Sequence, residues 1–303
     1  MTLNMKRAHN DWVLIADCGA TKIRWQRLSS AGVTETPWSG TGMNPYHLPL
    51  ERLEELLRES LPAEKRSGVA SVHFYGAGCR ANGAARMKQA LTSCFPAGCS
   101  IEVQSDLLGA ARALFGRGEG VCCILGTGAA CGFYDGCRIV RQVPSLGYVL
   151  GDEGSGAALG RRLVADVLQG VLPPDVCRRF MAESGLTQDE ILERVYHSPE
   201  AARFLAAQVS FLQRNLHRES AVRRLVEGEF SRFVERNLNV FCCDGRPVHV
   251  GFVGGVAAGF ADVLTPLLEK QGFVLAGILA DPMPGLVAYH IHQLKTTNDD
   301  VRQ

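Results

Sequence analysis

Two short turns carry the residue types that bind a nucleotide triphosphate. Residues Asp17–Thr21 (DCGAT) and Gly126–Gly128 (GTG) each follow an apolar run. Glycine lets backbone N–H groups approach a phosphate, threonine adds a hydroxyl donor, and a nearby carboxylate can hold Mg²⁺ through water. Each turn alone is a weak signal, because a glycine-threonine hairpin without a ligand is far commoner. Neither turn has the spacing of a Walker loop or of a dinucleotide-binding fingerprint.

Two further carboxylates lie at predicted helix starts. Asp106 begins a helix predicted over Asp106–Phe115, and Asp152 lies in the loop Gly151–Gly156 that leads into another helix. Asp and Ser are favoured helix N-caps, so capping alone explains either motif. Asp106 is also well placed as a base, since it follows a strand at a strand-to-helix junction.

Apolar runs predict the elements that must position these loops. The strands expected around the two turns span 12–16, 23–28, 33–39, 121–125, 131–134 and 137–143. The other expected strands span 69–75, 100–104 and 248–253, and the expected helices span 50–61, 81–94, 106–115, 156–172, 199–216, 220–239 and 284–294. Both halves begin with a strand, a Gly/Thr turn and a second strand, which predicts a duplicated α/β fold. We expect an N-terminal lobe over 1–115, with the helix at about 284–303 packed back on it, a C-terminal lobe over 116–283, and a ligand cleft between them.

Composition narrows the function classes. Of 303 residues, 46% are apolar and 21% charged, as in globular proteins, and the net charge of +1 gives no field that would attract nucleic acid or an anionic membrane. No apolar run is long enough to span a bilayer, and Met1–Asp11 lacks the apolar stretch of a signal peptide, so we expect a cytoplasmic protein. The eleven cysteines have no zinc-site or C-x-x-C spacing, which predicts buried, reduced thiols.

The order of these motifs along the chain resembles the N-acetylglucosamine kinases of the BadF/BadG/BcrA/BcrD-type ATPase family. The resemblance spans Leu14 to His290, and the motifs that carry it include GTGMNP (40–45), FYGAGC (74–79), SDLLGAARAL (105–114), CILGTG (123–128), LGYVLGDEGSGAALGR (146–161), FVGGVA (252–257) and PMPGLVAYH (282–290). It implies the duplicated ribonuclease H-like fold of the actin/hexokinase superfamily, with ATP and Mg²⁺ as cofactors. The implied activity is phosphorylation of the 6-hydroxyl of N-acetylglucosamine or a related amino sugar, and a homodimer is compatible with the resemblance.

The resemblance also implies a role for individual residues. Asp106 would be the general base on the acceptor hydroxyl, and Asp17 would support Mg²⁺. Asn44 and Asp152 would bind sugar hydroxyls. The residues that would hold the phosphates and the adenosine are Gly19, Thr21, Gly126, Thr127, Gly128, Gly254 and Gly255.

Three functions fit the motifs. A sugar kinase is favoured by the retained carboxylates and Asn44. The second is an ATPase that activates a partner enzyme, as the iron–sulfur dehydratase activators of the broader family do, although the cysteines here lack cluster spacing. The third is a non-catalytic sugar or nucleotide sensor. It is suggested by Ala129 and Ala130, which stand where the family carries polar side chains, each lost hydrogen bond being worth about 1 kcal/mol.

Overall fold

The computed structural model describes residues 12–242 and 247–300, which form two compact units. The first unit contains the chain up to Gly116 and again from Pro282, and the second contains Arg117–Asp281. Among the described residues, no helix is long and apolar enough to cross a membrane.

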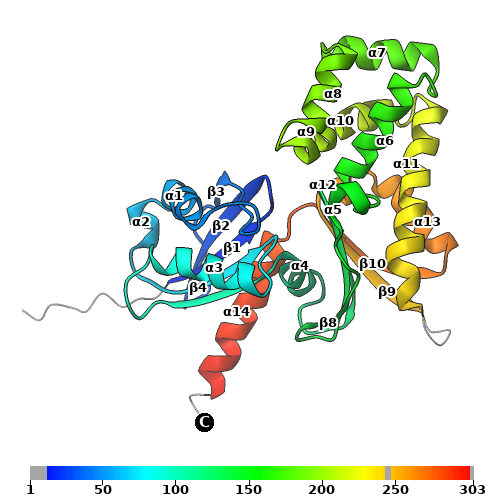
Figure 1. Ribbon diagram of the computed structural model, residues 1–303. Coiled ribbons are helices and arrows are strands. Elements are labelled where there is room, and N and C mark those ends of the chain that lie inside the picture. The colour runs from blue at the N-terminus through cyan, green and yellow to red at the C-terminus, as the bar shows by residue number, and fades with distance from the viewer. Residues whose placement is uncertain (1–11, 243–246, 301–303) are drawn as a thin grey trace, which may run out of the picture. The chain divides into compact units, whose positions relative to one another are not determined.

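A five-stranded mixed sheet organises the first unit (Figure 1). Its order is β3-β2-β1-β4-β5, with β1, β2 and β3 antiparallel and β4 and β5 parallel to β1. The strands are β1 (Trp12–Cys18), β2 (Lys22–Ser29), β3 (Trp38–Thr41), β4 (Val69–Gly76) and β5 (Ser100–Ser105). The third strand was predicted to begin at residue 33, but between Ser29 and Trp38 only Thr34 forms a bridge.

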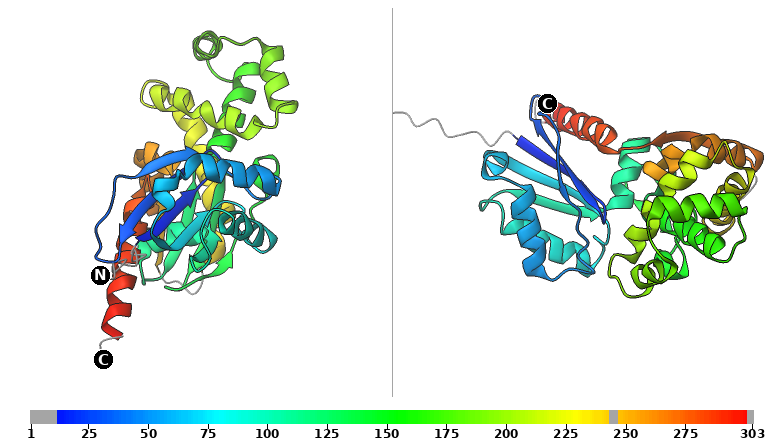
Figure 2. Two further views of the ribbon diagram at one scale, coloured as in Figure 1. Left: turned by 90° about the vertical axis from the view of Figure 1, so that its left-hand side faces the viewer. Right: turned by 90° about the horizontal axis from the view of Figure 1, so that it is seen from above.

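Helices cover both faces of this sheet. They are α1 (Leu50–Ser60), α2 (Ala63–Arg66), α3 (Asn82–Thr92), α4 (Asp106–Phe115) and α14 (Met283–Asp300). Leu14 and Ala16 belong to the core shared with α1 and α3, whereas Val13 and Ile15 pack against α14. Because side chains alternate along a strand, Asp17 shares the face of Val13 and Ile15. Helix α14 lies along α4 and the strands β1 and β2 (Figure 2), so the C-terminus completes the unit that the N-terminus begins.

The second unit repeats this sheet topology. Its order is β10-β9-β6-β7-β8, with β6, β7 and β8 antiparallel and β9 and β10 parallel to β6. The strands are β6 (Gly120–Leu125), β7 (Ala129–Tyr134), β8 (Ile139–Gln142), β9 (Val248–Val253) and β10 (Phe273–Leu279). The duplicated α/β architecture predicted from the sequence is therefore confirmed.

The helices of the second unit differ most from the prediction. They are α5 (Gly147–Leu150), α6 (Gly156–Leu168), α7 (Pro174–Ser184), α8 (Gln188–Tyr196), α9 (Ala201–Ala207), α10 (Val209–Asn215), α11 (Ser220–Phe233), α12 (Gly255–Gly259) and α13 (Ala261–Lys270). Helices α5, α7, α8, α12 and α13 and strand β10 were not predicted. The helix expected over 220–239 ends its α-helical part at Phe233 and continues as the π-helical turn η1 (Val234–Leu238) and the 3₁₀ turn η2 (Asn239–Phe241).

The cysteines follow the prediction in part. Cys122 and Cys123 are fully buried on β6, and no described cysteine forms a disulfide. Cys137 and Cys242 are exposed, which corrects the expectation of buried thiols at these two positions. Both lie outside strands, in a turn and after η2, where no sheet face covers them.

Candidate active site

Two carboxylates of the first unit lie in each other's electrostatic field. Asp17 is near the end of β1, and Asp106 is the first residue of α4. Burial, followed by the charge of Asp106, raises the pKa of Asp17 to about 7, although Arg24 opposes this shift. Burial also raises the pKa of Asp106, against the opposing effects of the Leu107 N–H and Arg80. Both carboxylates are therefore stronger bases than ordinary aspartates, and Asp17 is poised to exchange a proton or a cation near neutral pH.

The helix cap at Asp106 is provided by its neighbour. The hydroxyl of Ser105 accepts a hydrogen bond from the Leu108 N–H at 3.3 Å, which makes Ser105 the N-cap of α4. Asp106 Oδ1 accepts a hydrogen bond from the adjacent Leu107 N–H at 2.8 Å. The interpretation of Asp106 as the helix cap is thus wrong, because Ser105 is the N-cap of α4.

The carboxylates of the first unit fit a hydrated Mg²⁺. Within the described residues, no cluster of three or more His, Cys, Asp or Glu side chains is arranged to hold a metal. Mg²⁺ does not need such a cluster, since it keeps several waters and binds through one or two carboxylates together with substrate phosphates. The raised pKa of Asp17 shows that the cationic groups around it do not compensate its charge fully. A divalent cation would supply that compensation.

Asn44 lies in a loop packed against the first glycine turn. The Gly42 N–H donates to the Thr21 carbonyl, and a Cβ on Gly42 would come within 2.3 Å of the Gly19 carbonyl oxygen. Asn44 Oδ1 accepts the Tyr46 N–H at 2.9 Å. Close packing therefore fixes the Asn44 loop relative to Gly19 and Thr21.

The second glycine turn is fastened to a helix start. The Gly126 N–H donates to the Gly128 carbonyl, which closes the turn between β6 and β7. The first N–H groups of α6 donate back to it: Gly156 to the Gly126 carbonyl at 2.8 Å, and Ala157 to the Thr127 carbonyl at 3.0 Å. Helix starts leave such N–H groups without partners inside the helix, so these bonds hold the turn in place.

Asp152 packs its carboxylate against the same turn. A Cβ on Gly128 would lie 3.0 Å from Asp152 Oδ2, and the Ala129 N–H hydrogen-bonds to this carboxylate. Burial raises the pKa of Asp152 despite that bond. Asp152 has φ +59°, a left-handed conformation that is uncommon for residues other than glycine and costs about 1 kcal/mol or more. Ser155 is the N-cap of α6, so capping does not explain Asp152 either.

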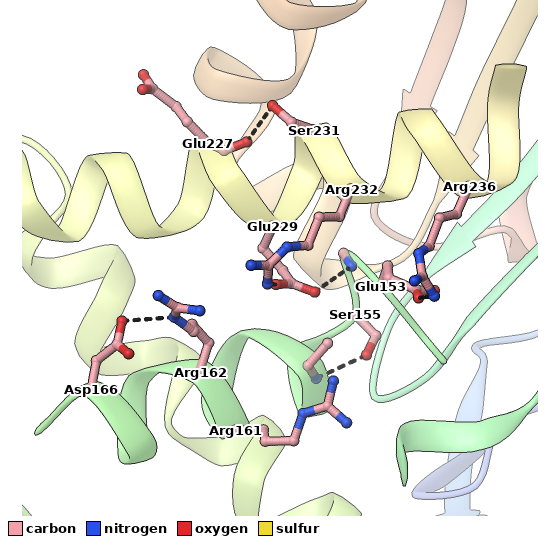
Figure 3. Close-up of polar contacts among 12 residues, drawn as sticks. Glu153, Ser155, Arg161, Arg162, Asp166, Glu227, Glu229, Ser231, Arg232 and Arg236 are labelled. Atoms are coloured by element: carbon pink, nitrogen blue, oxygen red, sulfur yellow. Dashed lines mark hydrogen bonds and ion pairs between the residues drawn. The ribbon is translucent and has the colours of Figure 1, made fainter. Parts of the chain in front are cut away.

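Side chains from α11 and η1 contact this loop (Figure 3). The buried carboxylate of Glu229 accepts the Gly154 N–H at 3.4 Å and pairs with Arg232 at 3.2 Å. Arg236, on η1, pairs with Glu153 at 2.9 Å. Both contacts hold the two residues that directly follow Asp152 in the loop.

A pocket of about 250 Å³ opens beside Asp152, within the second unit. Its size is suited to a ligand smaller than most drug molecules. The polar residues that line it are Ser145, Asp152, Glu153, Arg236 and Asn237, and the apolar ones include Ala129, Ala130, Cys131, Val143, Leu146 and Leu150. The Nδ2 atom of Asn237 is buried and has no hydrogen-bond partner within the described structure.

The two glycines after β9 differ in whether the surrounding structure leaves room for a side chain. Gly254 has φ +125°, and a Cβ there would lie 2.3 Å from the Leu125 carbonyl oxygen at the second turn. At Gly255 a Cβ would meet no atom within 4 Å. Gly254 is thus required by the packing of β9 against the turn, and Gly255 is not.

The structure adds residues that the sequence did not indicate. Arg80 lies near enough to Asp106 to lower its pKa, and Glu153, Arg236 and Asn237 line the pocket beside Asp152. No motif marks Arg236 or Asn237, because they lie more than 80 positions after Asp152 on a helix predicted to be regular. Glu153 lies next to Asp152 in the same loop, and the motif by itself assigns it no role.

Among known proteins, matches were found only in the comparison with solved structures. No family model and no curated protein matches the sequence. A candidate N-acetylglucosamine kinase from Porphyromonas gingivalis superposes with a TM-score of 0.87 at 40% identity, covering 92% of this chain and 99% of that one. A candidate N-acetylglucosamine kinase from Chromobacterium violaceum has a TM-score of 0.70 at 20% identity, covering 93% and 99%. A ROK-family glucokinase from Streptomyces griseus, in complex with glucose and AMPPNP, has a TM-score of 0.53 at 15% identity, covering 92% and 97%.

The duplicated sheet with a glycine turn in each copy defines an actin/hexokinase-like ATPase fold, which the last two matches support as fold relatives. The 40% identity to the Porphyromonas gingivalis protein over nearly the whole chain identifies the family within this fold. The chain belongs to the N-acetylglucosamine kinase-like branch of the BadF/BadG/BcrA/BcrD-type ATPases, the family that its motif order indicates.

Proposed function

We propose that this protein is an ATP-dependent kinase that phosphorylates the 6-hydroxyl of N-acetylglucosamine or a related amino sugar. The observation that carries the proposal is Asp106, a carboxylate that is not needed as a helix cap and whose pKa burial raises. A carboxylate whose pKa is raised is a stronger base than an ordinary aspartate and is suited to accept the proton of an attacking hydroxyl.

The other residues have matching roles in this proposal. Asp17 would hold Mg²⁺ through water, and Mg²⁺ would neutralise the charge that develops on the transferred phosphoryl group. Gly19 and Thr21 of the first turn, and Gly126, Thr127 and Gly128 of the second, would contact the phosphates. The backbone at Gly254 and Gly255 would lie against the adenosine.

The acceptor sugar would use the polar groups fixed by the two loops. The Asn44 side chain accepts the Tyr46 N–H through Oδ1, which leaves its amide group to donate to a sugar hydroxyl. Asp152 would accept from another hydroxyl, and the pocket beside it, which is smaller than most drug sites, suits a monosaccharide.

The decisive experiment measures ADP release from Mg·ATP with N-acetylglucosamine, N-acetylmannosamine, glucosamine and glucose. We expect sugar-dependent turnover that falls by roughly 10²–10⁴-fold in Asp106→Asn, because the base is lost while ATP binding remains. Asp175→Asn, on the exposed start of α7, removes the same charge elsewhere and should retain full activity.

Two other outcomes would overturn the proposal. Sugar-independent hydrolysis would favour an ATPase that activates a partner enzyme. Binding of ATP and sugar without any ADP release would favour a sensor, which Ala129 and Ala130 suggest, since they offer no side-chain donor to the pocket.

A further inference from the structure

Two thiols face each other across the hairpin that carries the second glycine turn. Cys123 on β6 and Cys131 on β7 are directly paired in the antiparallel register, and their Sγ atoms are 3.4 Å apart. Directly opposed residues of such a pair have Cα atoms about 4.5–5.5 Å apart. That separation lies inside the range of about 4.4–6.8 Å that a disulfide requires. A disulfide could therefore close here with side-chain rotation and little backbone movement.

The two thiols differ in their position relative to the pocket. Both are buried, but Cys131 lines the pocket beside Asp152 and Cys123 does not. Burial raises the pKa of Cys123 well above its usual value. A small oxidant that enters the pocket would thus meet Cys131 first, with Cys123 in position as the second, resolving thiol.

We propose that Cys123 and Cys131 are a redox-sensitive pair that forms a reversible intramolecular disulfide when a peroxide enters the pocket. In the first step, the Cys131 sulfur attacks one peroxide oxygen, the O–O bond breaks, and Cys131 sulfenic acid and water form. In the second step, the Cys123 sulfur attacks the Cys131 sulfur, the S–O bond breaks, and the disulfide and a second water form. The two thiols lose two electrons in total, and these reduce the peroxide.

The crosslink would change the site next to it. Cys131 Sγ now contacts the Asn237 carbonyl oxygen at 3.5 Å, and this contact would be lost as the sulfur turned toward Cys123. The bridge would also lock the two strands on either side of Gly126–Gly128. We expect oxidised protein to phosphorylate sugar several-fold more slowly, a consequence that rests on the proposed kinase function, whereas formation of the bridge does not.

The test uses the full-length protein treated with hydrogen peroxide, in a Cys137→Ser background that removes the exposed thiol nearby. Trypsin releases a peptide spanning 118–138, in which fragmentation by mass spectrometry locates any bridge. We expect loss of the mass of two hydrogen atoms and a Cys123–Cys131 linkage that dithiothreitol reverses. The linkage should be absent in Cys123→Ala and present in the matched variant Cys122→Ala, which alters the neighbouring buried thiol on the opposite face.

The outcomes separate the bridge from the kinase function. A bridge through Cys122, or sulfinic acid at Cys131 with Cys123 still reduced, would overturn the proposed pair. Activity that stays constant while the Cys123–Cys131 bridge forms would overturn its effect on the site. If the protein has no kinase activity at all, the peptide masses still decide whether the pair exists.

Discussion

At the scale of single residues, the site depends on carboxylates that the surrounding protein leaves only partly compensated. Asp17 and Asp106 are both held with raised pKa values by burial, and Asp106 adds its own charge to the field at Asp17. Such an arrangement costs folding free energy and is typical of functional sites. The positive charge of the proposed Mg²⁺ ion would compensate the remaining negative charge of these two carboxylates.

The pKa of Asp17 predicts how activity depends on pH. Since this pKa is about 7 in the folded protein without metal, sugar phosphorylation should fall as the pH drops through about 7, because protonated Asp17 no longer holds Mg²⁺. Metal and proton compete for the same group, so a higher Mg²⁺ concentration should move this acidic limb to lower pH. Measurement of kcat/KM for ATP across pH at two Mg²⁺ concentrations checks this. An acidic limb that does not respond to Mg²⁺ would exclude Asp17 as its origin.

The two glycines after β9 give a matched pair of substitutions. Gly254→Ala would place a Cβ 2.3 Å from the Leu125 carbonyl oxygen at φ +125°, so we expect it to destabilise the protein by about 1–3 kcal/mol and to displace the second turn. Gly255→Ala meets no atom and should be close to neutral for stability. Urea unfolding measures the free energy of unfolding of both variants. Equal values would show that the second turn accommodates the Cβ at position 254 without loss of stability.

At the scale of elements, a buried polar network attaches α14 to the sheet of the first unit. Arg112 Nη1 donates to the Tyr75 hydroxyl at 2.7 Å, and that hydroxyl contacts His290 Nε2 at 2.9 Å. Since the lowered pKa of His290 keeps its ring neutral, we assign the hydroxyl proton of Tyr75 as the donor to His290 Nε2, while the hydroxyl oxygen accepts from Arg112. Glu102 completes the network through His73 at 2.7 Å.

Acid should therefore weaken the docking of α14. Burial, then His73 and Arg112, lowers the pKa of His290 to about 3 from the ordinary 6.5. The folded state excludes a proton that the unfolded chain binds, so this contribution to stability is full above pH 6.5 and is lost as the pH falls toward 3. The loss should reach about 2 kcal/mol at about pH 5. The pKa of Glu102 is also lowered, to about 2, which acts in the same direction at lower pH.

Urea unfolding at neutral and acidic pH measures this effect. His290→Gln keeps an acceptor for Tyr75 and removes the titration, so its stability should change less between the two pH values. His292→Gln, at an exposed position of the same helix, should behave like the unaltered protein. The idea fails if the two variants have the same pH dependence.

At the scale of the whole molecule, the two units differ in how the chain builds them. The second unit is one continuous segment with its own core, whereas the first needs α14, which comes from the end of the sequence. Without α14 the sheet face formed by Val13, Ile15 and Leu28 would lose part of its cover, since only α4 would remain on it. Each such residue is worth roughly 1.5–3 kcal/mol when buried, a large fraction of a domain's stability of about 5–15 kcal/mol.

This difference predicts the behaviour of fragments. The segment 117–281 should fold alone with a cooperative unfolding transition, and the segment 1–116 should not. Adding residues 282–303 as a separate peptide to the fragment 1–116 should restore the structure of that fragment in part. The peptide carries Met283 and Leu286, which would cover the exposed face of its sheet. Circular dichroism and urea titration measure both. A cooperative transition in 1–116 alone would show that α14 is dispensable.

Much of this architecture can be predicted from local sequence signals. The apolar runs of β1, β6 and β9, the glycines between paired strands, and the repeat of that pattern lead to the duplicated fold, because strands and tight turns are encoded over a few neighbouring residues. Asp17, Asp106 and Asp152 are found in the same way, since each lies near the end of a strand or the start of a helix. The order of these motifs leads to the family.

Other features are decided by the tertiary structure. Helices α7 and α8 are not among these features, because the sequence carries local signals for both: α8 begins with the capping box Thr187–Glu190, and α7 begins at Pro174 and is followed by Gly185 in the left-handed conformation. Whether Ser105 or Asp106 caps α4 depends on backbone geometry, and the pKa values of the carboxylates depend on burial by residues far away in sequence. The contacts of Arg236 with Glu153 and of Cys123 with Cys131 form only when separate segments are packed together. Local patterns specify elements, but burial, charge and distance between segments are properties of the packed chain.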